Sequence, residues 1–96
     1  MTTHYLLFYE VVDDYVTRRQ PIRSAHLDYA QQFVDRGELI LAGALAEPVD
    51  QAVLLFRTET PDVPRAFATA DPYVVQGLVT RWWVRPWTTV IGPLSA

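Results

Sequence analysis

Two residues of this sequence could form an acid–base pair, His26 and Asp71. His26 lies in the stretch RSAHLDYA, which is typical of a helix. From Ile22, steps of four, three and four residues pass through His26 and end at Phe33, the spacing of the helix face that turns towards a core. An imidazole in such a position can act as a general base when a carboxylate binds its Nδ1–H and so determines which nitrogen carries the proton.

Asp71 is an unusual carboxylate because it is expected at the end of a helix, directly before Pro72. The negative end of the helix dipole disfavours an acid there, so the side chain is solvated or held by a donor. Two alternatives remain open from the sequence. Asp71 could simply initiate a turn with Pro72, and His26 could be a buried neutral imidazole bonded to a backbone carbonyl.

Arg23 and Tyr73 are the candidate substrate-binding residues. Arg23 lies one turn before His26, and a planar guanidinium can bind an anionic group through two hydrogen bonds. It could instead be solvated or paired with Asp28. The phenol of Tyr73 could orient a ligand or merely pack against a helix. His4, near the start of the chain, is expected to be exposed.

The composition excludes several classes of function. The chain has 96 residues, which predicts one domain over 1–96, and its net charge is −3 without any block of Lys and Arg. Nucleic-acid binding is therefore not expected. The absence of cysteine and the wide separation of the two histidines argue against a disulfide scaffold and a zinc site. No Gly-x-Ser-x-Gly elbow or phosphate-binding glycine loop occurs, so we expect neither a metal nor another cofactor.

The amino-terminal stretch MTTHYLLFYEVVDD has no positive charge before its apolar run, and acids follow it. This pattern predicts a strand rather than a signal peptide. No apolar run approaches the roughly 20 residues that span a bilayer. We therefore expect a cytoplasmic protein that does not associate with a membrane.

Four strands and two helices are expected along the chain. The expected strands are residues 3–11, 38–47, 51–59 and 79–91. The first helix should begin between Thr17, which has capping-box spacing to Gln20, and Pro21, which favours a first turn; it should end before Gly37. The second helix should occupy residues 60–71, with Thr60 as its N-cap and its end set by Pro72.

The order strand, helix, strand, strand, helix, strand predicts an α+β fold of the ferredoxin-like βαββαβ type. Its four strands would form an antiparallel sheet with both helices on one face. Gly43 should mark a bend or bulge, and Pro86 should place the last strand at an edge or mark a bulge.

The last strand is apolar on both sides. Trp82 and Val84 should point one way, and Trp83 and Trp87 the other way. Because two helices cover only one face of a sheet, a second copy of the chain is the simplest cover for the other face. We therefore expect a homodimer through the sheet face, with the tryptophans in the core and the interface rather than around a ligand.

Three segments, RSAHLDYAQQFVDRGELILAGAL, ATADPYVVQGLV and RWWVRPW, together resemble the YciI-like (YCII-related) family of the dimeric α/β-barrel superfamily. The resemblance covers nearly the whole chain. It rests on Arg-x-x-His-Leu at residues 23–27, Asp-Pro-Tyr at residues 71–73, and the closing pair Pro86-Trp87. It implies a ferredoxin-like protomer, a face-to-face dimer, and a His26–Asp71 pair in a pocket between sheet and helices.

The resemblance also implies small-molecule chemistry without a cofactor. One branch of the family removes chloride from a chlorinated hydroxyhydroquinone, and superfamily relatives isomerise lactones or oxidise aromatics. This chain has Gly43-Ala44 where the family often has Gly-Pro, and Asp50-Gln51 where the family often has a glycine. The substrate class therefore does not carry over. We expect a lyase, dehalogenase or isomerase that uses His26 and Asp71 on an aromatic or enolisable substrate. The alternative is a ligand-binding or accessory dimer in which the pair is structural.

Overall fold

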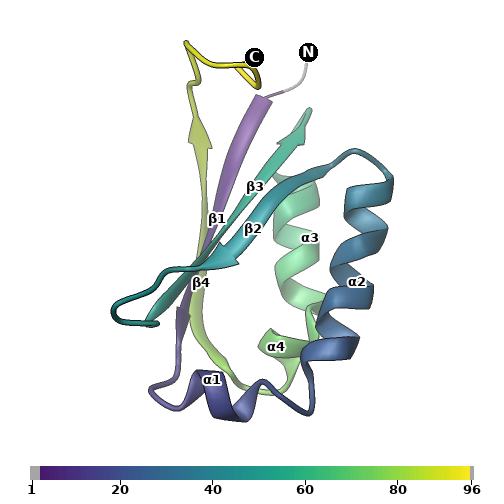
Figure 1. The fold of residues 1–96 in the computed structure, drawn as a ribbon. Coiled ribbons are helices and arrows are strands. Elements are labelled where there is room, and N and C mark those ends of the chain that lie inside the picture. Colours follow the sequence, from purple (N-terminus) through teal and green to yellow (C-terminus); the bar gives the residue numbers. More distant parts are fainter. Residues whose placement is uncertain (1–2, 96) are drawn as a thin grey trace.

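The computed structural model describes residues 3–95, which form one four-stranded sheet with helices on one face (Figure 1). The strands are β1 (Thr3–Val11), β2 (Leu39–Ala44), β3 (Gln51–Thr58) and β4 (Val79–Trp87). The helices are α1 (Tyr15–Arg18), α2 (Arg23–Asp35), α3 (Asp62–Ala70) and α4 (Pro72–Val75). Among the described residues, no helix is both long enough and apolar enough to cross a membrane.

The strand order is β2-β3-β1-β4, and every pair of neighbours is antiparallel. This arrangement confirms the predicted α+β, ferredoxin-like fold, in which α2 and α3 lie against the same face of the sheet (Figure 1). Strand β4 is an edge strand, as Pro86 predicted, because a residue without an N–H fits where no further strand needs a donor. It ends at Trp87 rather than at residue 91.

The core lies between the sheet and the two long helices. Alternate residues of β1 point into it, among them Leu7, which is completely buried. Phe67 of α3 joins the two layers, since its ring packs edge-to-face on Phe33 of α2 at 4.9 Å and on Phe56 of β3 at 5.3 Å. Burying a side chain of this kind stabilises the fold by roughly 1.5–3 kcal/mol. These contacts determine where α2 and α3 lie over the sheet.

The first long helix begins later than expected. Helix α2 starts at Arg23, so the predicted start between Thr17 and Pro21 was wrong. Residues 15–18 form only the single turn α1. Proline disfavours helical dihedral angles in the residue before it, which favours a break in the helix at this point. The resulting turn brings Arg19 to the edge of the cavity described below.

Gly37 ends helix α2, as predicted. Its φ angle of 76° lies in the left-handed region, which glycine adopts without strain. The N–H of Gly37 donates to the carbonyl of Val34, and the N–H of Glu38 donates to the carbonyl of Phe33. This is a Schellman motif, which satisfies the last carbonyls of the helix and turns the chain into β2. Helix α3 begins close to its predicted cap, since the N–H of Asp62 donates to Oγ1 of Thr60.

Strand β2 differs from its prediction in two ways. It spans Leu39–Ala44 instead of residues 38–47, and its irregularity lies between Leu39 and Leu41 instead of at Gly43. Gly43 pairs in regular register with Val53, so the predicted bulge there was wrong. The second half of β2 is exposed on its helix side as well, because α2 does not cover it. This uncovered edge is one wall of the cavity.

The prediction that His4 is exposed was also wrong. The side chain is 1% exposed, and its Nδ1 lies 2.7 Å from Oγ1 of Thr89. His4 lies on the sheet face away from the helices, where the segment after β4 folds back beside it (Figure 1). The sequence did not indicate that this segment returns to the sheet.

The two faces of β4 are arranged as expected. Trp82 and Val84 pack against the core, whereas Trp83 stacks on Phe8 on the open face, with ring centroids 5.3 Å apart. Trp87 is 47% exposed on that same face. The sheet therefore presents aromatic side chains on a face that no helix covers.

The left-handed conformation of Gly37 predicts a measurable asymmetry between two glycines. Gly37→Ala should lower the free energy of unfolding by about 1 kcal/mol, because alanine is strained at this φ although nothing lies within 4 Å of the added Cβ. Gly43→Ala is the matched control: its φ is not left-handed and its Cβ also meets open space, so it should not destabilise. Urea denaturation of both variants tests this. Equal losses would show that backbone conformation is not the cause.

Candidate active site

Asp71 lies at the junction of two helices. It follows the last residue of α3 and is the N-cap of α4, with φ −60° and ψ 126°. This extended conformation is the one that a residue before proline prefers. One carboxylate oxygen, Oδ1, accepts a hydrogen bond of 3.0 Å from the N–H of Tyr73. The apparent conflict with the α3 dipole is thus resolved, because the same carboxylate caps the amino-terminal end of α4.

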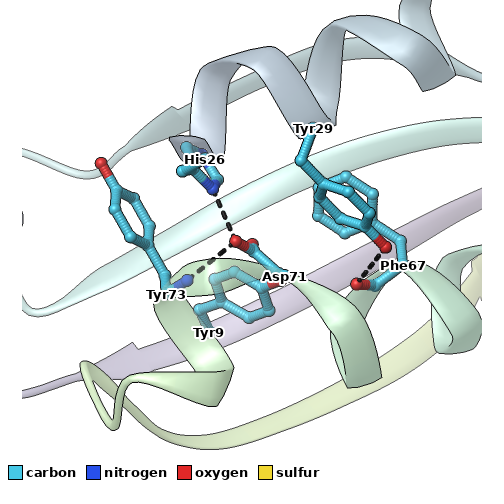
Figure 2. Close-up of polar contacts among 6 residues, drawn as sticks. All are labelled: Tyr9, His26, Tyr29, Phe67, Asp71 and Tyr73. Atoms are coloured by element: carbon cyan, nitrogen blue, oxygen red, sulfur yellow. Dashed lines mark hydrogen bonds and ion pairs between the residues drawn. The ribbon is translucent and has the colours of Figure 1, made fainter. Parts of the chain in front are cut away.

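Two further side chains bind the Asp71 carboxylate (Figure 2). Nδ1 of His26, from α2, lies 2.7 Å from Oδ1, and the hydroxyl of Tyr9, from β1, donates to Oδ2 at 2.7 Å. The Asp71 side chain is completely buried. A buried carboxylate is tolerated when donors satisfy its oxygens, and this one has three. The structure therefore brings together the two residues that the sequence proposed as a pair.

The contacts of Asp71 determine the tautomer of His26. A carboxylate accepts hydrogen bonds, so the short contact assigns the proton of the neutral imidazole to Nδ1. Nε2 then carries the free lone pair. The His26 side chain is 15% exposed and lines a cavity, so this basic nitrogen belongs to a ring that solvent and ligands can reach. This is the arrangement that a general base requires.

Tyr73 holds the imidazole of His26 in place. The two rings are stacked, with centroids 3.8 Å apart and planes only 7° from parallel. Tyr15 of α1 contacts the Tyr73 ring edge-on, with centroids 5.6 Å apart. The plane of the imidazole is thus set by a ring on one side and a carboxylate at Nδ1. Both constraints reduce the freedom of the base before any ligand binds.

A second hydrogen bond fixes α2 over the end of α3. The hydroxyl of Tyr29, one turn after His26, donates to the carbonyl of Phe67 at 3.0 Å (Figure 2). Phe67 lies one turn before Asp71. Because the two bonds are one turn apart on each helix, they set the spacing and the rotation of α2 relative to α3. The approach of His26 to Asp71 follows from this alignment.

The cavity beside His26 has a volume of about 160 Å³. Its walls come from β1, the α1–α2 region, the ends of β2 and β3, and α4. The residues that line it are Tyr9, Tyr15, Arg19, Arg23, His26, Leu27, Ala30, Ala42, Gly43, Ala44, Ala52, Leu54 and Tyr73. Both predicted substrate-binding residues, Arg23 and Tyr73, are among them. Within residues 3–95, no three acidic, histidine or cysteine side chains gather closely enough to share a metal ion.

The environment of Tyr9 keeps its hydroxyl protonated. Burial raises the pKa of this phenol well above its usual range, and the negative charge of Asp71 raises it further. Burial and Asp71 also raise the pKa of Tyr29. Both phenols therefore remain protonated hydrogen-bond donors at neutral pH. The Tyr9 hydroxyl thus donates a hydrogen bond to Asp71 and does not itself accept a proton from His26.

The sequence did not identify every residue of the site. Tyr9 and Arg19 were missed. A signal for Tyr9 existed, since it is an inward position of an alternating strand and a buried phenol needs a partner. For Arg19 there was no comparable signal, because its place at the cavity depends on the break before α2.

Comparison with known proteins gives consistent results. The model of the YCII-related domain family matches residues 3–88. The chain is also similar to Protein YciI of Escherichia coli O6:H1 and of Shigella flexneri. Each is 27% identical over 95 residues, a match that covers 90% of this chain and 97% of the relative.

Solved structures share the fold. One is a 5-chloro-2-hydroxyhydroquinone dehydrochlorinase from Burkholderia phenoliruptrix AC1100, in complex with 2,5-dihydroxybenzoquinone, with a TM-score of 0.75 and 18% identity. The match covers 91% of this chain and 95% of that one. Another is a NIPSNAP family protein from Agrobacterium tumefaciens, with a TM-score of 0.63, 14% identity, and coverage of 98% and 99%. At these identities the likeness shows the fold.

The raised pKa of Tyr9 predicts a loss of stability at alkaline pH. The unfolded chain releases the phenolic proton near pH 10.0, whereas the folded chain keeps it. The contribution of Tyr9 to the free energy of unfolding is therefore fully present below this pH and falls as the pH rises above it. Each such phenol contributes a slope of up to about 1.4 kcal/mol per pH unit. Tyr9→Phe should remove one such slope.

At neutral pH, Tyr9→Phe should also lower the free energy of unfolding by about 1–3 kcal/mol, because Oδ2 of Asp71 loses its donor. Tyr5→Phe, at another inward position of β1 away from Asp71, should cost less. Urea denaturation between pH 7 and pH 11 measures both effects. Identical alkaline slopes for wild type and Tyr9→Phe would contradict the assignment.

Proposed function

Because the chain belongs to the YCII-related family, we propose that it is a small enzyme that transfers protons on a small molecule without a cofactor. His26 is the general acid–base and Asp71 orients it. The observation that carries the proposal is the 2.7 Å contact between Nδ1 of His26 and the buried Asp71 carboxylate. The imidazole ring that makes this contact also lines the cavity. The contact leaves Nε2 free to accept a proton.

In the proposed mechanism, Nε2 of His26 takes a proton from a carbon beside a carbonyl group or from a phenolic oxygen of the substrate. The imidazolium that results is stabilised by Asp71, whose other contacts already hold it in place. The proton then returns to a different substrate atom or leaves with a departing group. A positioned base of this type contributes roughly 10²–10⁴-fold to a rate.

The cavity supports a substrate of about one ring. Its volume is about 160 Å³, and a dry cavity of roughly 150 Å³ in another protein accommodates benzene. The dehydrochlorinase with this fold is bound to a dihydroxybenzoquinone, a molecule of that size. We therefore propose an aromatic or enolisable substrate and a lyase, dehalogenase or isomerase reaction. Loss of hydrogen chloride from a hydroxylated ring needs a base that takes the proton as chloride leaves.

The general-base role of His26 predicts the outcome of two assays. They are chloride release from 5-chloro-2-hydroxyhydroquinone and incorporation of solvent deuterium into a panel of small enolisable carbonyl compounds. The protein should turn over at least one of these probes, and His26→Gln should reduce that rate about 10²–10⁴-fold. His4→Gln, which changes the other histidine outside the cavity, should keep the activity. Undiminished turnover by His26→Gln would exclude the mechanism.

The orienting role of Asp71 predicts a second loss. In Asp71→Asn, the side-chain amide cannot accept hydrogen bonds from all three donors, because its nitrogen is itself a donor. The imidazole of His26 then loses the contact that determines its tautomer and its orientation. We expect at least a hundredfold fall in kcat with a smaller change in KM, because the cavity lining is unchanged. A normal kcat would show that His26 does not depend on this carboxylate.

A non-catalytic ligand-binding role is the second candidate, and one observation favours it. The Asp71 contacts join β1, α2 and α4, so the network could serve stability alone. Both His26→Ala and Asp71→Ala should lower the melting temperature in either case, because the Asp71 contacts join three elements, so turnover separates the two roles. A probe that wild type turns over and that both variants fail to turn over supports catalysis, whereas lost stability in a protein whose wild type turns over no probe supports the structural role.

The open face of the sheet supports a homodimer. Phe8 lies opposite Val53 and Trp83 on neighbouring strands, and Leu6 lies opposite Leu55, so apolar side chains run across three strands. None of the helices α1 to α4 of the described chain covers them (Figure 1). A second copy placed face to face would bury this surface. A stable interface needs roughly 800 Å² from each partner, so a whole sheet face is the kind of surface that it requires. We propose this dimer as the state in which the protein works.

The proposed dimer predicts a charge-sensitive face. Trp83→Glu should convert the dimer to monomer in sedimentation velocity at micromolar concentration, because it buries a charge in the interface. Val34→Glu on the outer side of α2 is the control and should leave the dimer intact, since that residue is exposed away from the sheet face. A monomeric wild-type protein would exclude the proposal.

A further inference from the structure

The charge of the cavity lining is opposite to that of the protein. The chain has a net charge of −3, yet the charged side chains that line the cavity are Arg19 and Arg23. Among the described residues, no carboxylate lines it. Asp71 is completely buried behind His26 and does not line the cavity. A ligand that enters therefore meets two guanidinium groups and an imidazole.

In the part of the chain that the structure describes, no acidic side chain neutralises the two arginines. Within residues 3–95, neither Arg19 nor Arg23 lies within ion-pair distance of a carboxylate. The neighbouring Arg18 differs, since it pairs with Asp14 at 3.7 Å. Arg19 is instead held over the ring of Tyr15, with its guanidinium carbon 5.1 Å from the ring centroid. The cavity thus keeps two cations whose hydrogen-bonding groups are available to a ligand.

A third donor lies in the same wall. Tyr73 is only 2% exposed, so water does not reach its hydroxyl, and this hydroxyl has no hydrogen-bond partner among the described residues. It points away from Asp71 (Figure 2). Burial raises the pKa of this phenol, whereas the positive charges of Arg23 and Arg19 lower it, so both arginines act on the same place. A buried hydroxyl without a partner destabilises the empty protein and is satisfied when a ligand accepts a hydrogen bond from it.

We propose that the cavity selects ligands that carry an ionised oxygen, a carboxylate, phenolate or enolate, bound by Arg19 and Arg23 and by the hydroxyl of Tyr73. This inference rests on the proposed function, because the ligand is the substrate of that enzyme. A guanidinium binds such an oxygen pair in a planar, two-bond geometry. Because Tyr73 stacks on His26, an anion anchored at the phenol end places the rest of the molecule beside the imidazole.

The first experiment measures charge selectivity by calorimetry with two matched pairs of probes. One pair is 2,5-dihydroxybenzoquinone, which is ionised at pH 7, and neutral 2,5-dimethoxybenzoquinone; the other is benzoate and benzamide. We expect at least one anion to bind at least tenfold more tightly than its neutral partner, and less tightly as salt is added. Equal affinities, or no binding of either anion at millimolar concentration, would overturn the inference.

The second experiment assigns the selectivity to the two arginines. Arg19→Gln and Arg23→Gln should each weaken binding of the anion roughly tenfold or more, and Arg23→Lys should recover part of the loss. Neutral probes should bind as before. Arg18→Gln is the matched control, with the same change of charge in the same segment but outside the cavity, and should have little effect. An equal loss in Arg18→Gln would show only a general effect of charge.

The Tyr73 hydroxyl has a separate signature. Tyr73→Phe keeps the ring that stacks on His26 and removes the hydroxyl alone, so the empty protein should melt at or above the temperature of wild type. Binding of the anion should weaken roughly 10- to 100-fold. Lower stability together with unchanged binding would show that the hydroxyl serves the fold and not the ligand.

The two proposals fail in different ways. If the anion site is real but the protein is not an enzyme, the arginine variants lose binding while no probe is turned over by wild type. If the enzyme is real but does not select anions, turnover depends on His26 while neutral probes bind and react as well as charged ones. Binding in His26→Gln provides a further check, since it should retain most of the affinity for the anion.

Discussion

The buried carboxylate of Asp71 is the constraint on which the rest of the site depends. A completely buried charge is costly unless donors surround it, and each donor here comes from a different element: Tyr9 from β1, His26 from α2, and the backbone of Tyr73 from α4. The carboxylate that orients the imidazole therefore also connects the sheet to the helices through hydrogen bonds. Stability and the geometry of the base depend on the same three bonds.

The position of α2 determines whether a cavity forms beside the His26–Asp71 pair. The aromatic contacts of Phe67 and the bond from Tyr29 hold α2 against α3, so the helix covers the first residues of β2 and leaves the last ones uncovered. The uncovered edge, the α1–α2 turn and α4 then enclose a cavity beside His26. A helix placed squarely over β2 would fill this space. The cavity is a consequence of helix packing and not of any motif.

Much of the fold followed from local pattern. Alternating strands, the glycine at the end of α2, and Pro72 after Asp71 led to the correct order of the strands and the two long helices, and Pro86 predicted the edge position of β4. The errors arose where several signals competed. Thr17 and Pro21 both suggested a helix start, but proline disfavours helical dihedral angles in the residue before it, and the chain makes the single turn α1 before α2 begins. The burial of His4 depends on the return of residues 88–95, which have no periodic pattern.

The sequence by itself determined which side chains could do chemistry. The spacing of His26 along its helix and the placement of Asp71 before Pro72 are local properties, and local rules were enough to select both. Only the tertiary structure decided that the two side chains meet, that Tyr9 completes the carboxylate, and that Arg19 joins Arg23 at an unpaired cationic wall. Contacts between residues 45 or 62 positions apart depend on how helices pack over a sheet. Packing depends on the shapes of many core side chains together, which no short stretch of sequence contains.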